Sequence, residues 1–169
     1  MRLRGIVFAI GATLVLASVA TYAVGTQLPA TRTGTASLSV ERPAHEVMAV
    51  LTDVASQPRW RPDVAAVDVQ SPTAWIERKA DGEVVTFRIT AHSERSLHLA
   101  FESSRGYVGQ WHGSLTPAAQ TGSTLIEVQE SATIDAPLKR VIARVVFDPE
   151  EFAADYLARL AGEVRRRAR

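Results

Sequence analysis

Residues 50–64 read VLTDVASQPRWRPDV and place a large aromatic side chain, Trp60, in a short loop between two prolines. An apolar helical segment ends just before Asp53, and Pro58 and Pro62 restrict the backbone on both sides of the tryptophan. A tryptophan held in this way either plugs the core where a helix meets a sheet or caps the open end of a cavity. The sequence leaves both interpretations open.

The sequence around this loop predicts one strand, then a short helix, then six further strands and finally helices at the C-terminus. Seven segments alternate apolar and polar residues as half-buried strands do, at residues 35–40, 64–69, 74–79, 84–92, 97–101, 107–115 and 124–134. A short helix is expected to begin at Pro43. After Pro137 the apolar period changes from two to between three and four. Asp148 and Pro149 then predict the start of a last helix, which ends near Arg167.

These elements predict an α+β domain in which a curved antiparallel sheet of about six to seven strands wraps on a long C-terminal helix. A sheet with one apolar face needs a cover, and only the last helix is long enough to supply one. A single helix cannot fill so wide a cup, so we expect a cavity between the sheet and this helix.

The N-terminal segment is expected to be separate from that domain. The stretch Ile6–Val24 carries no charge, and a helix of this length would span roughly 28 Å, about one hydrocarbon core. We therefore expect residues 1–25 to be a single-pass membrane anchor, with a cleaved signal peptide as the alternative. Arg2 and Arg4 precede it, which predicts an extracytoplasmic domain. Residues 26–34 are expected to be a linker and residues 35–169 the domain.

Composition and motifs exclude several functional classes. The net charge is +1, so there is no basic field to favour nucleic acid. The chain has no cysteine, which excludes disulfides and thiolate chemistry. The four histidines follow no metal-binding spacing and there is no glycine-rich phosphate loop, so no metal and no cofactor are expected. The sequence does not define an oligomeric state.

Strand alternation predicts which side chains face the last helix. The expected inward set is almost entirely apolar and includes Phe87, Phe101 and Trp111, with Tyr156 contributed by the helix. Glu130 is the exception, because it shares the alternation of the apolar residues of its strand. An inward carboxyl group would have a raised pKa and could act as an acid, a base or a polar anchor. A bulge that turns it toward solvent is the alternative.

The chain resembles the SRPBCC superfamily, also called START-like or helix-grip, and within it the polyketide cyclase/dehydrase and lipid-transport type. The resemblance covers residues 35–167 and rests on the opening strand, the segment Pro43–Val47, Asp53 with the Pro-x-Trp-x-Pro loop that follows, and the long last helix. It implies a helix-grip fold that binds a hydrophobic small molecule or lipid in its cavity.

The candidate ligand-binding residues on this interpretation are Trp60, Phe87, Phe101, Trp111, Glu130 and Tyr156. The sequence contains no motif for a catalytic residue, so binding without catalysis is the leading hypothesis. The alternatives are a polyketide cyclase or aromatase-like enzyme that uses the same cavity, and an interaction module whose cup is filled by its own side chains.

Overall fold

The computed structural model of the protein describes residues 18–120 and 122–168, which belong to two compact units. The larger unit comprises Arg32–Thr133 together with the chain from Asp148 onward. The smaller unit comprises the chain up to Thr31 together with Ile134–Phe147. The sheet and the last helix therefore belong to the same unit.

The order of elements confirms the predicted α+β arrangement. The elements are β1 (Thr31–Val40), α2 (Ala44–Thr52), the 3-10 helix η1 (Val54–Arg59), β2 (Val64–Ser71), β3 (Ala74–Lys79), β4 (Val84–His92), β5 (Ser96–Ser103), β6 (Tyr107–Pro117), β7 (Thr124–Thr133), α3 (Pro137–Val146) and α4 (Pro149–Arg167). All of them except α3 lie in the larger unit, apart from the first residue of β1.

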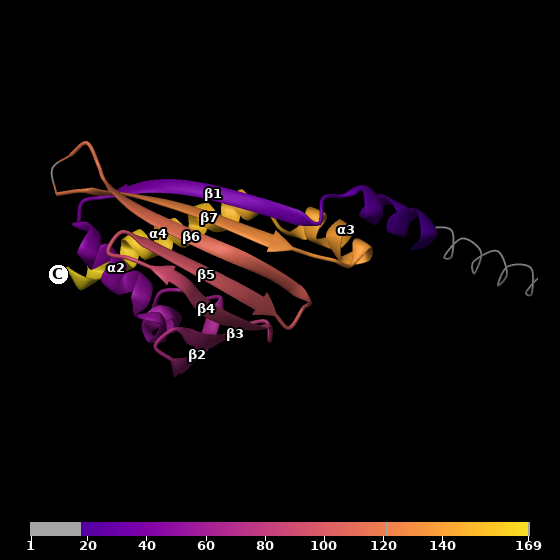
Figure 1. Ribbon diagram of the computed structural model, residues 1–169, viewed down its shortest axis with the longest axis horizontal. Coiled ribbons are helices and arrows are strands. Elements are labelled where there is room, and N and C mark those ends of the chain that lie inside the picture. The colour runs from indigo at the N-terminus through magenta and orange to yellow at the C-terminus, as the bar shows by residue number, and fades with distance from the viewer. Residues whose placement is uncertain (1–17, 121, 169) are drawn as a thin grey trace, which may run out of the picture. The chain divides into compact units, whose positions relative to one another are not determined.

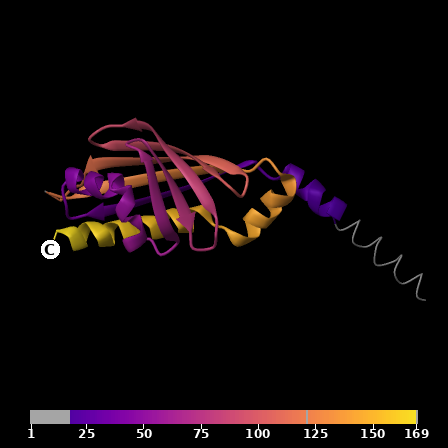
Figure 2. The same ribbon diagram turned by 90° about the horizontal axis from the view of Figure 1, so that it is seen from below.

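The seven strands form one sheet in the order β1-β7-β6-β5-β4-β3-β2 (Figure 1). From β2 to β7 each strand pairs antiparallel with the next, as expected of a meander. β1 pairs with β7 at the opposite edge from β2. Figure 2 shows the sheet curving over α4, which confirms that the last helix covers one face. We call this face the inner face.

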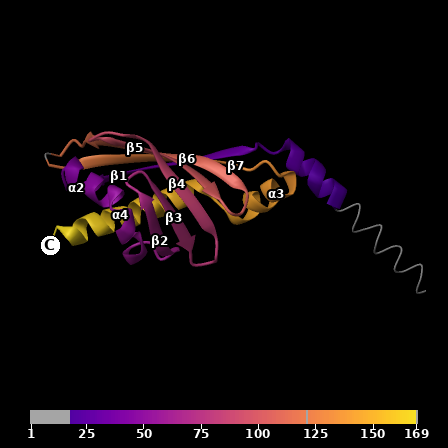
Figure 3. The same ribbon diagram turned by 60° about the horizontal axis from the view of Figure 1, so that its bottom comes forward.

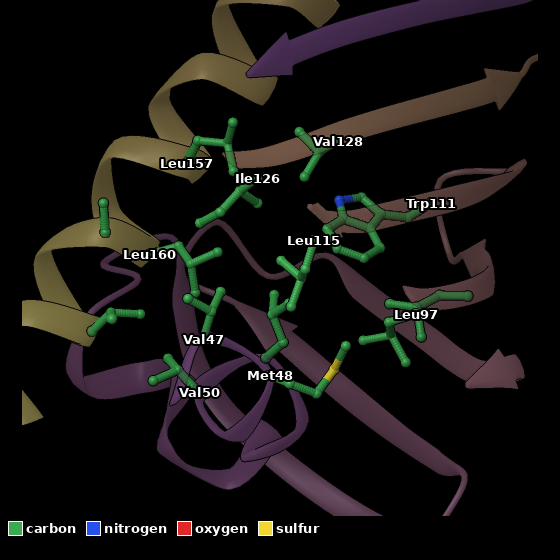
Figure 4. Close-up of a cluster of buried hydrophobic side chains, with 14 of the residues drawn as sticks. Val47, Met48, Val50, Leu97, Trp111, Leu115, Ile126, Val128, Leu157 and Leu160 are labelled. Carbon is green, nitrogen blue, oxygen red and sulfur yellow. The ribbon is translucent and has the colours of Figure 1, made fainter. Parts of the chain in front are cut away.

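The core lies where α4, α2 and the inner face meet (Figure 4). Leu157 and Leu160 of α4 pack toward Ile126 of β7 and Val47 of α2, and all four side chains are almost completely buried. Full burial of such side chains contributes about 1.5–3 kcal/mol each. α2 lies beside the C-terminal half of α4, as Figure 3 shows, so the best-packed part of the core is at that end.

The start of α4 follows the signals in the sequence. Asp148 is the N-cap, and its side-chain oxygen accepts hydrogen bonds from the backbone N–H groups of Glu150 and Glu151 at 2.9 and 3.3 Å. Pro149 occupies the first turn, where its missing N–H costs nothing. The carbonyl group of Pro149 lies against Gly34 of β1 so closely that a Cβ there would collide with it. This contact joins the first strand to the last helix.

β1 is longer than expected. It begins at Thr31 rather than at residue 35, so residues 31–34 of the expected linker belong to the sheet. These residues extend the strand that pairs with β7, and Gly34 among them packs against the backbone of Pro149 at the start of α4.

The N-terminal part of the described chain is helical at residues 18–27. Among the residues that the structure describes, no helix combines the length and the apolar character needed to cross a bilayer. Most of the anchor expected at residues 1–25 lies outside the described residues, which begin at position 18.

Candidate functional site

The inner face is tightly packed at one end and half-buried at the other. Leu115 and Ile126, which face each other across β6 and β7, are buried. Further along the same strands Trp111 faces Glu130 and Gly109 faces Ala132, and there the β7 side chains are only half-buried. We call this part of the inner face the open end. Its half-buried side chains are Trp60, Phe87, Ile89, Glu130, Ala132 and Tyr156.

Three aromatic rings from three elements meet at the open end. Tyr156 of α4 lies between Trp60, which follows η1, and Trp111 of β6, with ring centroids 5.8 and 5.7 Å away. The approach of Trp111 is edge-on, a favourable geometry for aromatic pairs. Burial raises the pKa of Tyr156, so its hydroxyl group stays neutral at physiological pH. The structure thus brings three of the expected site residues together.

A second aromatic group runs across β3, β4 and β5. Trp75 stacks on Phe87 with centroids 5.2 Å apart, and Phe87 lies 5.6 Å from Phe101. These three residues are register partners on adjacent strands, which is why their rings line up. The expected residues Phe87 and Phe101 therefore belong to this row, and Trp60, Trp111 and Tyr156 form the other group.

Buried charges that strand alternation did not predict lie beside the aromatic groups. The Glu77 carboxylate is almost fully buried and pairs with Arg61 at 3.1 Å and with Lys79 at 2.8 Å. It also accepts a hydrogen bond from Nε1 of Trp75 at 3.3 Å. Arg61 in turn bonds Asp63 at 2.9 Å, so two cations and two anions balance. Alternation along β3 could have indicated this cluster, because Trp75, Glu77 and Lys79 are two residues apart and so share one face of the strand.

Arg61 joins this charged cluster to the open end. Its guanidinium carbon lies 5.6 Å from the ring centroid of Tyr156, within the range of a cation–π contact. The charged partners raise the pKa of Arg61, against the opposing effect of burial, so it stays a cation. A fixed positive charge therefore faces the aromatic rings at the edge of the site.

Glu130 brings a carboxyl group to the open end. Burial raises its pKa to about 7; Arg61 and Lys79 oppose the shift, and Glu77 adds to it. Within the described residues, no side chain or backbone group hydrogen-bonds the Glu130 carboxyl group. The prediction of a raised pKa is confirmed. A carboxyl group of this kind is present in both its neutral and its charged form near neutral pH.

A second polar group of the open end also has no partner. Nε1 of Trp60 is buried and has no hydrogen-bond partner among residues 18–120 and 122–168. A buried N–H group without a partner costs about 1–3 kcal/mol, so such groups are rare in folded proteins. A ligand with an oxygen acceptor would remove this cost.

The sheet also carries a hollow of about 530 Å³, but it is not the expected cavity. Its lining comes mostly from side chains that alternate with the inward set, on the face opposite to α4: Thr86, Arg88, Ala100, Glu102, Val108, Gln110, Ser131 and Thr133. Phe87 and Phe101 border it, whereas Trp111, Glu130 and Tyr156 do not. On the side of the sheet that α4 covers, the ring of Tyr156 packs against those of Trp60 and Trp111.

The histidines lie away from the open end. His98 and His112 are register partners whose rings stack 4.0 Å apart on the strand face that alternates with the inward residues. In the described part of the chain, no three His, Cys, Asp or Glu side chains come together as metal ligands would.

A curved antiparallel sheet wrapped on a C-terminal helix, with an aromatic inner face, defines the helix-grip class of proteins. Comparison with known sequences agrees: the profile described as polyketide cyclase/dehydrase and lipid transport matches residues 31–165. The chain belongs to this family, and so to the SRPBCC or START-like superfamily. No curated protein sequence matches the chain significantly.

Solved structures with the same fold have diverged far in sequence. A START superfamily protein from Mycobacterium smegmatis is 15% identical, with a TM-score of 0.64 over 79% of this chain and 97% of its own. The Zhui aromatase/cyclase from a Streptomyces species is 16% identical, with a TM-score of 0.63 over 82% and 96%. Norcoclaurine synthase from Thalictrum flavum is 12% identical, with a TM-score of 0.62 over 80% and 87%. These likenesses establish the fold.

The raised pKa of Glu130 predicts a pH-dependent effect of Glu130→Gln on stability. The folded protein holds the proton up to about pH 7, whereas an unfolded chain loses it near pH 4.5. The wild type therefore loses stability as the pH rises through this window, by at most about 3 kcal/mol. Glu130→Gln should match the wild type at pH 4 and be more stable at pH 8, as measured by urea unfolding.

Glu127→Gln is the matched control, because Glu127 is exposed on the same strand. It should follow the wild type at both pH values. Equal effects of the two substitutions at pH 8 would contradict a special environment for Glu130.

Proposed function

We propose that the protein binds an apolar small molecule or lipid at the open end of the inner face, beneath α4. The observation that carries the proposal is the combination of half-buried aromatic rings with two polar groups, Nε1 of Trp60 and the Glu130 carboxyl group, for which the described residues provide no hydrogen-bond partner. Binding sites for small molecules are typically apolar and contain a few convergent polar groups, as this one does.

The polar groups indicate what such a ligand carries. Trp60 offers an N–H donor and Glu130 offers a carboxyl group that can donate or accept a hydrogen bond. An aromatic or acyl molecule with one hydroxyl or carbonyl oxygen would match both. The structure of norcoclaurine synthase contains dopamine and hydroxybenzaldehyde, two small aromatic molecules with hydroxyl groups, which supports this ligand class.

We also propose that the domain is tethered to a membrane by the uncharged stretch at residues 6–24 and lies on the extracytoplasmic side. A hydrophobic ligand partitions into the bilayer. A tethered binding domain would therefore meet that ligand at a high effective concentration.

Two neighbouring substitutions on β7 test where the ligand binds. Ala132→Trp would add a large side chain at the open end, whereas Ser131→Trp would add one in the hollow on the opposite face. We expect Ala132→Trp to weaken binding of 2-naphthol at least tenfold and Ser131→Trp to leave it unchanged. Titration of naphthol fluorescence measures both, and circular dichroism checks that each variant is folded.

The reverse result, with Ser131→Trp blocking binding, would place the ligand in the outer hollow and overturn the proposal. No binding of 2-naphthol or of fluorescent fatty acids by the wild type, together with no lipid in native mass spectra of the purified protein, would overturn it as well.

The Trp60 indole N–H group predicts a preference for oxygen-bearing ligands. Trp60→Phe keeps an aromatic ring and removes the donor, so it should weaken binding of 2-naphthol about threefold to tenfold. Binding of naphthalene, which has no acceptor oxygen, should change much less. The ratio of the two affinities, measured by competition with a fluorescent probe, isolates the hydrogen bond. An equal loss for both molecules would assign Trp60 a packing role alone.

Glu130 also supports a second candidate function, an enzyme of the cyclase or aromatase type. A carboxyl group with a pKa of about 7 is well placed to exchange protons at neutral pH, and burial beside aromatic rings is how enzymes obtain such groups. The Zhui aromatase/cyclase has the same fold.

The enzymatic alternative predicts that Glu130→Gln abolishes turnover while it preserves the fold and 2-naphthol binding within a few-fold. The assay measures the rate at which a poly-β-ketone cyclises to an aromatic product, which is detected by liquid chromatography. Glu127→Gln is the control. A wild-type rate equal to the uncatalysed rate, or a Glu130→Gln rate equal to the wild-type rate, would reject this role of Glu130.

A further inference from the structure

The smaller unit exposes an apolar side of α3 that has no part in the ligand binding proposed for the larger unit. Along α3, large apolar residues recur at helical spacing and are exposed, namely Leu138, Ile142, Val145 and Val146. The last two are 81% and 73% exposed. No residue of α3 is buried. An isolated exposed valine is ordinary, but a continuous stripe of this kind indicates an interaction surface.

The other side of α3 is basic. The helix contains Lys139, Arg140 and Arg144 and no acidic residue. Arg140 also fixes the start of the helix, because its guanidinium donates hydrogen bonds to the backbone carbonyls of Ile134 and Asp135 at 2.7 and 2.9 Å. The helix is thus amphipathic, with cationic residues on one side and exposed apolar residues on the other.

α3 is attached to the helix at residues 18–27, within the same unit (Figure 1). The backbone of Pro137 lies against Gly25 so closely that a Cβ would not fit, and the N–H group of Ile134 bonds the carbonyl of Ala30 at 2.9 Å. The helix at residues 18–27 also exposes large apolar side chains, at Val19, Tyr22 and Val24. Residues 18–24 of this helix are the end of the uncharged stretch that begins at Ile6.

We infer that α3 is a membrane-surface helix, whose apolar side enters the headgroup region of a bilayer that contains anionic lipids. An amphipathic helix with Lys and Arg on its polar side is the structure that binds such an interface. The cations gain from the negative surface potential, by about 1 kcal/mol per residue near the surface. The attached helix at residues 18–27 exposes apolar side chains as well, so both described helices of the smaller unit offer apolar surface for a lipid contact.

The absence of cysteine from the chain allows a direct test on the full-length protein. Single substitutions Val145→Cys and Arg144→Cys place a polarity-sensitive NBD dye on the apolar and the basic side of α3 at adjacent, exposed positions. The proteins are mixed with vesicles of equal parts phosphatidylglycerol and phosphatidylcholine, with and without shallow doxyl-labelled lipid. We expect a blue-shifted emission and a several-fold stronger doxyl quenching at position 145 than at position 144. Vesicles of phosphatidylcholine alone, or high salt, should reduce the quenching.

Each other outcome contradicts the inference. Water-like emission at both positions would show that α3 stays off the bilayer. A blue shift at position 145 without vesicles would show that protein, not lipid, covers the apolar side of α3. If this shift grew with protein concentration, the covering protein would be a second copy; if it did not, it would be another part of the same chain. The assay is distinct from ligand binding, since adding Ile142→Glu, a change on the same exposed apolar side, to both labelled variants should abolish the quenching difference between the faces and leave 2-naphthol affinity unchanged.

Discussion

The structure depends on one constraint: a single helix, α4, must cover the apolar inner face of a seven-stranded sheet. At its C-terminal half α4 is assisted by α2, and there Val47 and Leu160 are fully buried. Toward its N-terminal half the cover is incomplete, so Tyr156 stays half-buried. The candidate site is therefore a consequence of the packing geometry. It lies where apolar surface remains after the helix has covered what it can.

The charged cluster around Glu77 borders this incompletely covered part of the inner face through Arg61. Burial of a lone carboxylate would cost several kcal/mol, but Arg61, Lys79 and the indole of Trp75 satisfy it. The same cluster holds Arg61 over the ring of Tyr156 and so orders the loop that carries Trp60. Of the two interpretations of Trp60, the structure supports packing on the core at Tyr156. Its N–H group has no hydrogen-bond partner among the described residues, and a role at the mouth of a ligand site stays a prediction.

Alternation of residues in the sequence predicted the fold and part of the site. It placed Trp111 and Glu130 inward, and pairing across β6 and β7 put them opposite each other. It could not locate Arg61, because its partner Glu77 lies sixteen residues away in the sequence, on β3. Alternation also led us to expect too large a cavity beneath α4, because the volume of a cavity depends on how the side chains pack and not on the number of strands around it. Alternation and spacing also could not show that the apolar side of α3 is exposed, because helical spacing of apolar residues is the same for a buried face and an exposed one.

The electrostatics of the open end link the binding and the enzymatic alternatives to one variable, the protonation of Glu130. The neutral carboxyl group donates a hydrogen bond to a ligand oxygen, whereas the carboxylate accepts one and attracts Arg61 more strongly. A ligand that displaces water from the open end increases the desolvation of Glu130 and so favours its neutral form, unless the ligand itself donates a hydrogen bond. Binding of a carbonyl compound should thus take up protons near pH 7, and binding of a donor should release them. Because its pKa is raised, the Glu130 carboxyl group that would anchor a ligand could also protonate that ligand. Whether this scaffold acts as a carrier or as an enzyme then depends on whether the bound molecule has a bond that proton transfer can make or break.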